Sequence, residues 1–517
     1  MSLLWPDDHP PDAGEDDPAG DTPDPDCFGD LHLDKIVDAL LAGRDRHRLR
    51  AWFQRLPADA ATVAHRQDVA ADLARAELRH PVEVFADAMT EVRTGIERAH
   101  RFSHPHQSHR SALDAAGTYC DAVSTLADAL GAAEAGSAGL SSFAGYLAGY
   151  VSDPGFAEME REANRLRGEI GRVRYSLNIA PNRVRVELPA SDVDLGAAVG
   201  SAFERFRRGE PPRRRPRPVG TGELDHIGGQ ILDAVAKLFP EVFNEISRFA
   251  ERYAAFVAEP VARFDREAQW YLCYLERVDS LAGRGLVFCR PELAAAGTTD
   301  EAVRGGFDLA LALASERDVV TNDYQLSGPE RVLVVTGPNQ GGKTTFARAF
   351  GQLHHLAALG LPVPATEARL VRTDRVFTHF EREEHMVDLR GKLADDIEAL
   401  RRILASATER SVIVANEVFS STTLDDARLL GQRALSAIGR LGAVGVYVTF
   451  VDELATLAPT TVSMVAGVER DDPTRRTFRL ERRPPDGKAY ARSLAERYGL
   501  DYDTLRTKLS PGARLAR

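Results

Sequence analysis

A stretch from Gly337 to Thr345 has the residue types and spacing that suit phosphate binding. It reads GPNQGGKTT and fits the pattern G-x-x-x-x-G-K-[ST]. Glycine lets the backbone wrap closely, so that its N–H groups can converge on phosphate oxygens. The Lys343 ammonium can reach the β/γ-phosphates of a nucleotide, and the Thr344 hydroxyl can ligate Mg²⁺. The candidate phosphate-binding residues are Gly337, Pro338, Asn339, Gln340, Gly341, Gly342, Lys343, Thr344 and Thr345.

A second candidate pair, Asn416 and Glu417, stands where the apolar run 411–415 ends. At such a strand end, an Asp normally holds Mg²⁺ and the next Glu orients the attacking water. Glu417 can still act as a general base. Asn416 can hydrogen-bond a metal-bound water but brings no negative charge, so we expect weaker Mg²⁺ binding. The alternative for Glu417 is a surface acid at a strand end.

Four consecutive hydroxyl residues, Ser420 to Thr423, follow this pair. A hydroxyl-rich turn before a helix can cap that helix. The same hydroxyls can donate to a γ-phosphate, within one chain or across a dimer. The sequence favours neither role over the other.

Short apolar runs that alternate with helical patterns must position these residues. The run Val332–Thr336 predicts a strand before the glycine-rich turn, and a helix starts near Lys343. Similar runs recur toward the C-terminus, which indicates a mostly parallel sheet covered on both faces. We therefore predict a phosphate-loop ATPase domain over residues 286–490, followed by a helical tail at 491–517. The further strands are expected at 375–380, 411–415, 445–450 and 461–468, with an edge strand at 477–483.

Residues 31–285 show helical spacing over most of their length. An exception lies at 172–188, where two β-rich runs flank Ala180 to Asn182 and predict a hairpin. The fold class is thus a long all-helical region followed by an α/β domain. The first apolar stripe of the helical region consists of Leu33, Ile36, Val37, Leu40 and Leu41.

Seven arginines follow the hairpin in a span interrupted by Pro and Gly. Such a run can contact nucleic-acid phosphates. A solvated linker is the alternative, because only Phe206 offers an aromatic surface nearby. The hairpin and arginine-rich loop together cover residues 172–217. The candidate DNA-contacting residues are Arg205, Arg207, Arg208, Arg213, Arg214, Arg215 and Arg217.

Composition is that of a globular protein, with 44% hydrophobic and 27% charged residues among 517. No apolar run is long enough for a transmembrane helix, and the N-terminus has no secretory signal pattern. The four cysteines show no CxxC spacing, which favours a reducing cytoplasm. We expect a cytoplasmic protein without a membrane partner.

The net charge of −12 comes almost entirely from residues 1–30, which hold ten acids and no Lys or Arg. The rest of the chain carries a formal charge of only −2. A segment so rich in Asp and Pro cannot bury enough apolar surface to offset its ordering entropy. We therefore expect residues 1–30 to form a disordered acidic tail.

Several motifs together resemble the MutS-type DNA mismatch repair proteins. GPNQGGKTT, then SATERSVIVANEVFSSTTLDDA and VYVTFVDELA, are similar to the ATPase domain of that family. Weaker similarity extends over most of residues 31–510. The resemblance implies an ABC-type ATPase that dimerises with composite nucleotide sites, attached to a helical core and lever that embrace DNA. It implies ATP and Mg²⁺ as cofactors, and DNA and a second copy of the chain as partners.

Three positions depart from the family's pattern. Asn416 stands where the family has its metal-binding Asp. Phe450 stands where a histidine lies in the family's nucleotide site, so the resemblance makes Phe450 a further candidate nucleotide-binding residue. Gly391 stands where a serine reaches across the dimer. These departures put fast hydrolysis in doubt while leaving ATP binding in place.

Two functions follow from these features. The first is an ATP-dependent, homodimeric DNA-binding protein of the MutS type, in which ATP binding and hydrolysis close the dimer and move the levers. We expect no wedge-type mismatch reading, since only the acidic tail precedes the lever-like helices. The alternative is a nucleotide-gated protein–protein switch with slow or no hydrolysis and no need for DNA.

Overall fold

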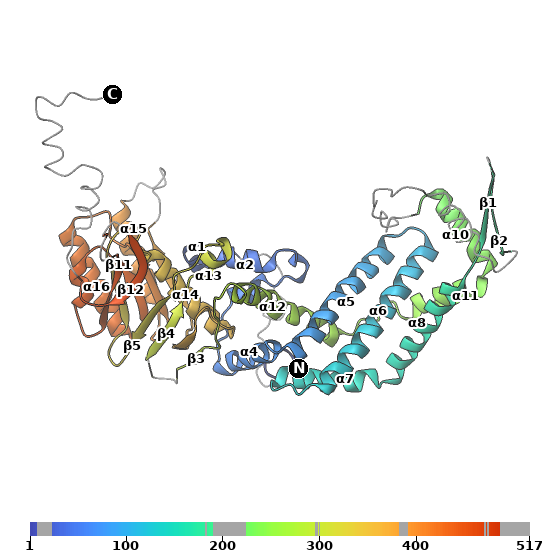
Figure 1. The fold of residues 1–517 in the computed structure, drawn as a ribbon, viewed down its shortest axis with the longest axis horizontal. Coiled ribbons are helices and arrows are strands. Elements are labelled where there is room, and N and C mark those ends of the chain that lie inside the picture. The colour runs from blue at the N-terminus through green and yellow to red at the C-terminus, as the bar shows by residue number, and fades with distance from the viewer. Residues whose placement is uncertain are drawn as a thin grey trace, which may run out of the picture. The chain divides into compact units, whose positions relative to one another are not determined.

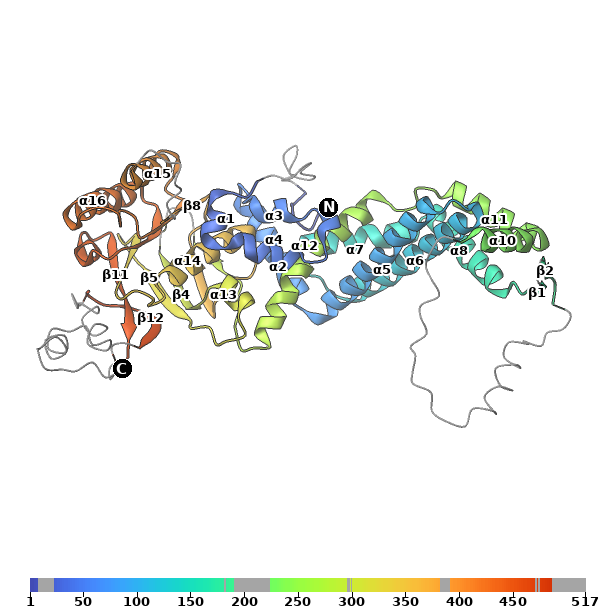
Figure 2. The same cartoon turned by 90° about the horizontal axis from the view of Figure 1, so that it is seen from above.

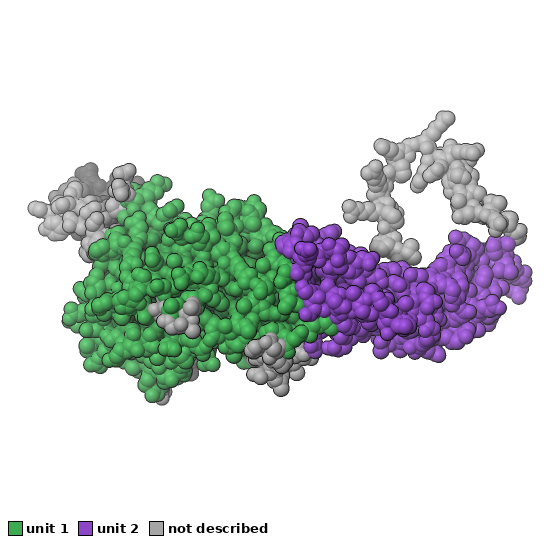
Figure 3. All heavy atoms as spheres, turned by 90° about the horizontal axis from the view of Figure 1, so that it is seen from below, with its two compact units in different colours: residues 1–74, 136–139, 269–517 green, residues 75–135, 140–268 purple. Residues whose placement is uncertain are grey.

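The computed structural model describes residues 1–7, 23–180, 183–189, 224–294, 298, 300–381, 391–469, 472 and 475–485. The chain divides into two compact units (Figure 3). Unit 1 comprises residues 1–74, 136–139 and 269–517, and unit 2 comprises residues 75–135 and 140–268. Helices and a mixed sheet make up the fold (Figure 1), as the sequence predicts in outline.

Unit 2 is built from long helices and one hairpin (Figure 2). Helices α5 and α6 approach closely at Gly95, where an added Cβ would lie 2.8 Å from the Cβ of Ala115. Glycine is therefore needed at this crossing. Two of the helices, α7 and α12, have residues in both units. The helices are α5 (Ala76–Arg101), α6 (Pro105–Ala132), α7 (Ala138–Val151), α8 (Pro154–Arg172), α10 (His226–Leu238), α11 (Pro240–Arg252) and α12 (Glu259–Ala282).

The predicted hairpin is confirmed by strands β1 (Ser176–Ala180) and β2 (Arg183–Glu187), which pair antiparallel. Leu177 lies opposite Val186 in this register, so apolar side chains share one face. Val186 packs against a small apolar cluster that includes α10 and α11 residues. The seven arginines at 205–217 lie outside the described residues.

The start of the chain is folded into unit 1. Leu3, Leu4 and Trp5 are buried, and the Trp5 ring meets Trp52 edge-on at 5.9 Å between centroids. The expectation of a disordered tail is therefore wrong for residues 1–7, because three apolar side chains offset the ordering cost there. It is also wrong for the start of helix α1, which buries Phe28. Residues 8–22 lie outside the described part of the chain.

In the described part of unit 1, five helical segments come before α5 in the chain. Helix α1 lies against strand β8 and helix α14 of the sheet region. The Gln352 side chain on α14 donates to the Leu31 carbonyl at 2.9 Å, which ties this helical part to the sheet region. The segments are α1 (Asp26–Leu31), α2 (Leu33–Leu41), η1 (Asp45–His47), α3 (Arg50–Gln54) and α4 (Ala60–Leu73).

The described part of unit 1 contains a six-stranded sheet in the order β12-β11-β6-β10-β9-β8. All neighbouring strands are parallel except β11 and β12. The prediction of a mostly parallel sheet is confirmed, and the predicted edge strand is found to run antiparallel to its neighbour. The strands are β6 (Val332–Thr336), β8 (Val376–Phe380), β9 (Val412–Asn416), β10 (Val444–Val448), β11 (Thr461–Val468) and β12 (Arg476–Arg482).

Helices cover both faces of this sheet. On one face, Val334, Ile413 and Tyr447 share a buried cluster with residues of α15 (Lys392–Ser406) and α16 (Leu424–Leu441). The buried helix α14 (Lys343–Leu359) contacts β9 and β10. Strands buried on both faces are continuous apolar runs, which is why the sequence identifies them.

A four-stranded sheet in the order β3-β7-β4-β5 adjoins the first, and the sequence does not predict it as a separate sheet. Strand β5 contacts β12 of the larger sheet. The short helix α13 (Leu309–Ala314) follows β4, and the 3-10 helix η2 (Asp452–Thr456) follows β10. The strands are β3 (Glu292–Leu293), β4 (Glu301–Gly306), β5 (Asn322–Leu326) and β7 (Glu367–Leu370).

Among the helices described, none is long and apolar enough to cross a membrane.

Candidate nucleotide-binding site

The glycine-rich loop joins buried strand β6 to the N-terminus of α14. Gly337 and Gly342 have φ of +113° and +91°, a region that favours glycine. A Cβ on Gly337 would also lie 3.0 Å from the backbone nitrogen of Ala466 on β11. The loop thus passes close against β11 at Gly337, and α14 starts at Lys343 with its first-turn N–H groups and positive dipole end at the loop.

A cavity of about 600 Å³ lies beside this loop. Its lining includes Asn339 to Thr345 of the loop, Glu417 after β9, and Phe478 on β12. The segment 315–322 before and at the start of β5 completes the wall. The fold therefore brings together the loop and Glu417, which are 72 or more residues apart in sequence.

Lys343 is almost fully buried, at 5% exposure. Its ammonium donates to the Gly337 carbonyl at 2.9 Å and to the Pro338 carbonyl and Asn339 Oδ1, each at 3.3 Å. Burial lowers the pKa of Lys343, whereas the nearby Glu417 carboxylate raises it. A buried cation at the mouth of the loop suits a polyphosphate, whose charge would compensate the desolvation.

Thr344 and Asn416 meet at the candidate metal position. The Thr344 hydroxyl donates to Asn416 Oδ1 at 3.2 Å. Both groups offer the hard oxygen atoms that Mg²⁺ takes, so the donor set fits this ion. Neither carries charge, and the nucleotide phosphates would have to supply it.

Glu417 lies at the end of β9 in an uncommon backbone conformation, with φ of +55°. Its carboxylate is 3.9 Å from the Lys343 ammonium. Its N–H donates to the Val448 carbonyl of β10 at 3.0 Å. Glu417 is therefore not a solitary surface acid, since it faces the cavity and the loop lysine.

The hydroxyl-rich turn has a capping role. Thr423 is the N-cap of α16, and its hydroxyl oxygen accepts from the Asp426 N–H at 3.3 Å. The Ser420 hydroxyl donates to Glu381 Oε1 at 2.9 Å, at the end of β8. The capping interpretation is confirmed for Thr423, and the interpretation of these hydroxyls as γ-phosphate donors stays a prediction.

Gly391 and Phe450 lie outside this cavity lining. Gly391 is the N-cap of α15, and an added Cβ would meet nothing within 4 Å. Phe450 follows β10 and is 49% exposed. Neither departure from the family's pattern therefore creates a steric conflict within the described chain.

Phe478 is a cavity residue that the sequence analysis missed. It has φ of +57° and is 48% exposed on β12. The Asn322 side chain donates to its carbonyl at 3.2 Å and accepts from the Leu480 N–H at 2.7 Å. An isolated aromatic on an edge strand carries no sequence signal, because the pairing of β12 with β11 and its contact with β5 bring Phe478 to the loop.

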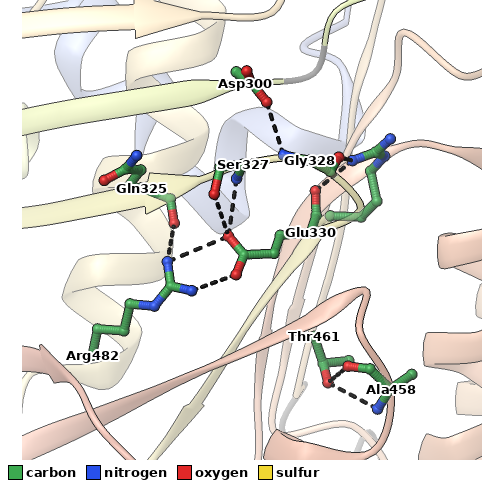
Figure 4. A network of polar contacts seen from close by, with 9 residues as sticks. Asp300, Gln325, Ser327, Gly328, Glu330, Ala458, Thr461 and Arg482 are labelled. Atoms are coloured by element: carbon green, nitrogen blue, oxygen red, sulfur yellow. Dashed lines mark hydrogen bonds and ion pairs between the residues drawn. The ribbon is translucent and has the colours of Figure 1, made fainter.

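Charged contacts hold the C-terminal end of β12 against the turn before β6 (Figure 4). Arg482 pairs with Glu330 in the turn before β6, and Glu330 Oε2 also accepts from the Ser327 N–H at 2.9 Å. The Arg482 guanidinium further donates to the Gln325 carbonyl at 3.4 Å. These contacts join the two sheets at the C-terminal end of β12, four residues after Phe478.

Comparison with known proteins supports this interpretation of the loop. Residues 333–480 match the family model for MutS domain V. An endonuclease MutS2 from Thermus thermophilus is 30% identical over 191 residues, or 37% of this chain and 26% of the relative. A DNA mismatch repair protein MutS from Erythrobacter litoralis is 30% identical over 317 residues, or 58% of this chain and 34% of the relative.

A second DNA mismatch repair protein MutS, from Streptococcus suis, is 25% identical over 298 residues, or 55% of this chain and 34% of the relative. The chain spans about a quarter to a third of the length of these relatives. The resemblance identified from the motifs is thus confirmed: residues 333–480 match MutS domain V, and the chain is similar to MutS and MutS2 proteins at 25–30% identity.

Proposed function

We propose that the chain binds ATP with Mg²⁺, hydrolyses it slowly, and couples this cycle to DNA binding as a MutS-type homodimer. One observation carries the proposal: Lys343, Thr344 and Glu417 line a single cavity at the end of a glycine-rich loop. The ATPase domain would be residues 286–490. The helical region 31–285 would be the core and lever, and the relatives' names point to DNA as the partner.

The chain's own groups suffice for a hydrolytic site. Loop N–H groups and Lys343 would hold the β- and γ-phosphates, with the buried ammonium acting at low dielectric. Thr344 and Asn416 would hold Mg²⁺, which neutralises phosphate charge when bound. Glu417 would accept a proton as water attacks the γ-phosphorus and the bond to the ADP oxygen breaks. The exposed ring of Phe478 would stack on the base.

Slow turnover follows from the same donor set. Asn416 leaves the metal position without a protein charge, and Gly391 offers no hydroxyl to a partner's site. The charge at the metal position and the hydroxyl for a partner's site are missing, whereas the glycine-rich loop is intact. These features favour ATP binding over ATP hydrolysis. This observation supports the second candidate, a nucleotide-gated protein–protein switch that does not require DNA.

Binding is tested by titrating a fluorescent ATP analogue with Mg²⁺ into the wild type and Lys343→Ala. We expect Lys343→Ala to lose at least tenfold in affinity, because a buried charge-assisted contact is worth about 1.5–3 kcal/mol. Lys237→Ala, at an exposed lysine on α10, is the matched control and should bind as the wild type does. No binding by the wild type would overturn the proposal.

Function is tested by measuring ATP hydrolysis with plain, mismatched and branched duplex DNA. Stimulation by one DNA class, abolished in Lys343→Ala, would support the DNA-coupled ATPase. Tight ATP binding without stimulation by any DNA would favour the switch.

A further inference from the structure

The turn that carries Glu417 is strained and must be held by its surroundings. Glu417 and Phe419 both have positive φ, +55° and +64°, although neither is glycine. Such a conformation is strained for a residue with a side chain and persists only where neighbouring contacts determine it. Interactions from other elements must therefore fix this backbone.

The Phe419 end of the turn is held by Asp396. The Phe419 N–H donates to Asp396 Oδ2 at 3.1 Å, and the Phe419 side chain is buried in the cluster beneath α15 and α16. At the other end, the Glu417 N–H is held by the Val448 carbonyl. Contacts therefore hold the turn at both ends, and the contact at the Phe419 end comes from α15.

Asp396 has both carboxylate oxygens engaged. It is 6% exposed, and its Oδ1 contacts His379 Nε2 on β8 at 2.8 Å. A buried carboxylate is costly unless its lone pairs are satisfied, and here two different elements satisfy them. The His379 contact fixes the orientation in which Oδ2 reaches Phe419.

A second acid, Glu381, also contacts the Glu417 turn and is more exposed to solvent than Asp396. Glu381 accepts from the Ser420 hydroxyl and pairs with Lys392, one helical turn before Asp396. Two acids from two elements thus bind two successive residues of the turn. Asp396 is the more buried of the two and the one that accepts from the backbone.

We propose that Asp396, oriented by His379, is a positioning residue that sets the backbone of the Glu417 turn and thereby aims Glu417 at the loop. The inference rests on the proposed ATPase function of the same cavity. Asp396 is not part of the cavity lining, so its replacement should spare nucleotide binding. Turnover should fall, because Glu417 would lose the conformation that puts it 3.9 Å from Lys343.

The test compares Asp396→Ala with Asp395→Ala, at the exposed acid one residue earlier on α15. Asp396→Asn is the isosteric variant, since its amide oxygen can still accept from the Phe419 N–H. Nucleotide affinity is measured by titration, and single-turnover hydrolysis by radiolabelled ATP. Backbone protection of residues 417–421 is measured by hydrogen–deuterium exchange.

We expect Asp396→Ala to keep nucleotide affinity within threefold of the wild type, to lose at least tenfold in turnover and to lose protection at 417–421. Asp396→Asn should retain part of the turnover and part of the backbone protection that Asp396→Ala loses. Asp395→Ala should match the wild type. Equal protection and turnover in Asp396→Ala and Asp395→Ala would overturn the inference. A wild type that does not hydrolyse ATP would count against the proposed function instead, and the exchange experiment would still decide the role of Asp396.

Discussion

At the scale of single residues, Asn416 is the position where chemistry departs most from that of a fast ATPase. Its side-chain oxygen lies 3.2 Å from the Thr344 hydroxyl, where a carboxylate would add a full charge to the metal position. Lys343 and Glu417 are in place around it. The proposed ATPase site would therefore have its phosphate-binding group and its base, and would lack one charge at the metal position.

The residue-scale prediction concerns Asn416→Asp. Restoring a carboxylate should tighten the apparent Mg²⁺ affinity of the nucleotide complex roughly tenfold, equivalent to about 1.4 kcal/mol, and should raise turnover. A Mg²⁺ titration of nucleotide binding measures this. Asn416→Gln keeps the amide and is the control. Equal Mg²⁺ dependence in Asn416→Asp and the wild type would mean that the metal is held elsewhere.

At the scale of elements, the nucleotide cavity depends on strand β12 and its attachment to β5. The Asn322 side chain holds the backbone of Phe478 and of Leu480, and Arg482 holds the strand end through Glu330. The cavity wall is thus made by an antiparallel edge strand, whose position is set by polar contacts.

Phe478→Ala tests this wall. Removing the exposed ring should weaken ATP binding by about 1 kcal/mol, or roughly five- to tenfold, because stacking on the base is removed. Phe478→Tyr keeps the ring and should bind as the wild type does. Affinities of both variants for ATP and for inorganic triphosphate separate base stacking from phosphate contacts. If Phe478→Ala loses affinity equally for ATP and for inorganic triphosphate, Phe478 does not contact the base.

Glu330 gives a pH-dependent prediction for the β12 attachment. Burial raises the pKa of Glu330, but hydrogen bonds from Arg482 and Ser327 outweigh it, so the pKa is lowered overall from 4.5. The folded state then binds the proton more weakly than the unfolded chain. The contact therefore stabilises the fold above about pH 4.5, and this stabilisation disappears as pH falls through the lower folded-state pKa.

Glu330→Gln should accordingly be less stable than the wild type by roughly 1 kcal/mol at pH 7, a value limited by the half-exposed Arg482. Thermal unfolding at pH 7 should show a midpoint lower by about 2–4 °C. The difference in stability between the two proteins should narrow as pH falls below about 4.5. Glu481→Gln on the same strand, whose side chain is 64% exposed, is the control. A gap that widens in acid would contradict this account.

At the scale of the whole molecule, the proposed dimer and the proposed DNA contact are separate questions. ATP with Mg²⁺ should shift the wild type from monomer to dimer in light scattering, because nucleotide would complete a composite site. Lys343→Ala should stay monomeric at the same concentration. If the mass of each protein is the same with and without nucleotide, ATP does not drive dimer formation.

Replacing the arginines between Arg205 and Arg217 by glutamine tests the proposed DNA binding. If these side chains bind phosphates, affinity for duplex DNA should fall, and the slope of log K against log salt should flatten by about 0.9 for each phosphate that is no longer neutralised. ATP binding is the internal control and should not change. An unchanged salt slope would leave the arginines as a solvated linker.

The sequence alone determined the glycine-rich loop, the parallel strands and the helices that flank them. Val332 to Thr336 is a continuous apolar run, and the glycines of the loop stand at fixed spacing, so local composition encodes both. The hairpin was equally predictable, because two β-rich runs flank a Pro-Asn turn. In each case the signal lies within a window of roughly ten residues.

Only the tertiary structure decided the cavity wall, the second sheet and the N-terminal segment. Phe478 and Asp396 acquire their places through partners 156 and 23 residues away in sequence. In the sequence, Leu3 to Trp5 belong to an acidic segment, and only the folded structure shows that they are buried. Long-range contacts such as these depend on how elements meet, and no local pattern of residue types encodes that.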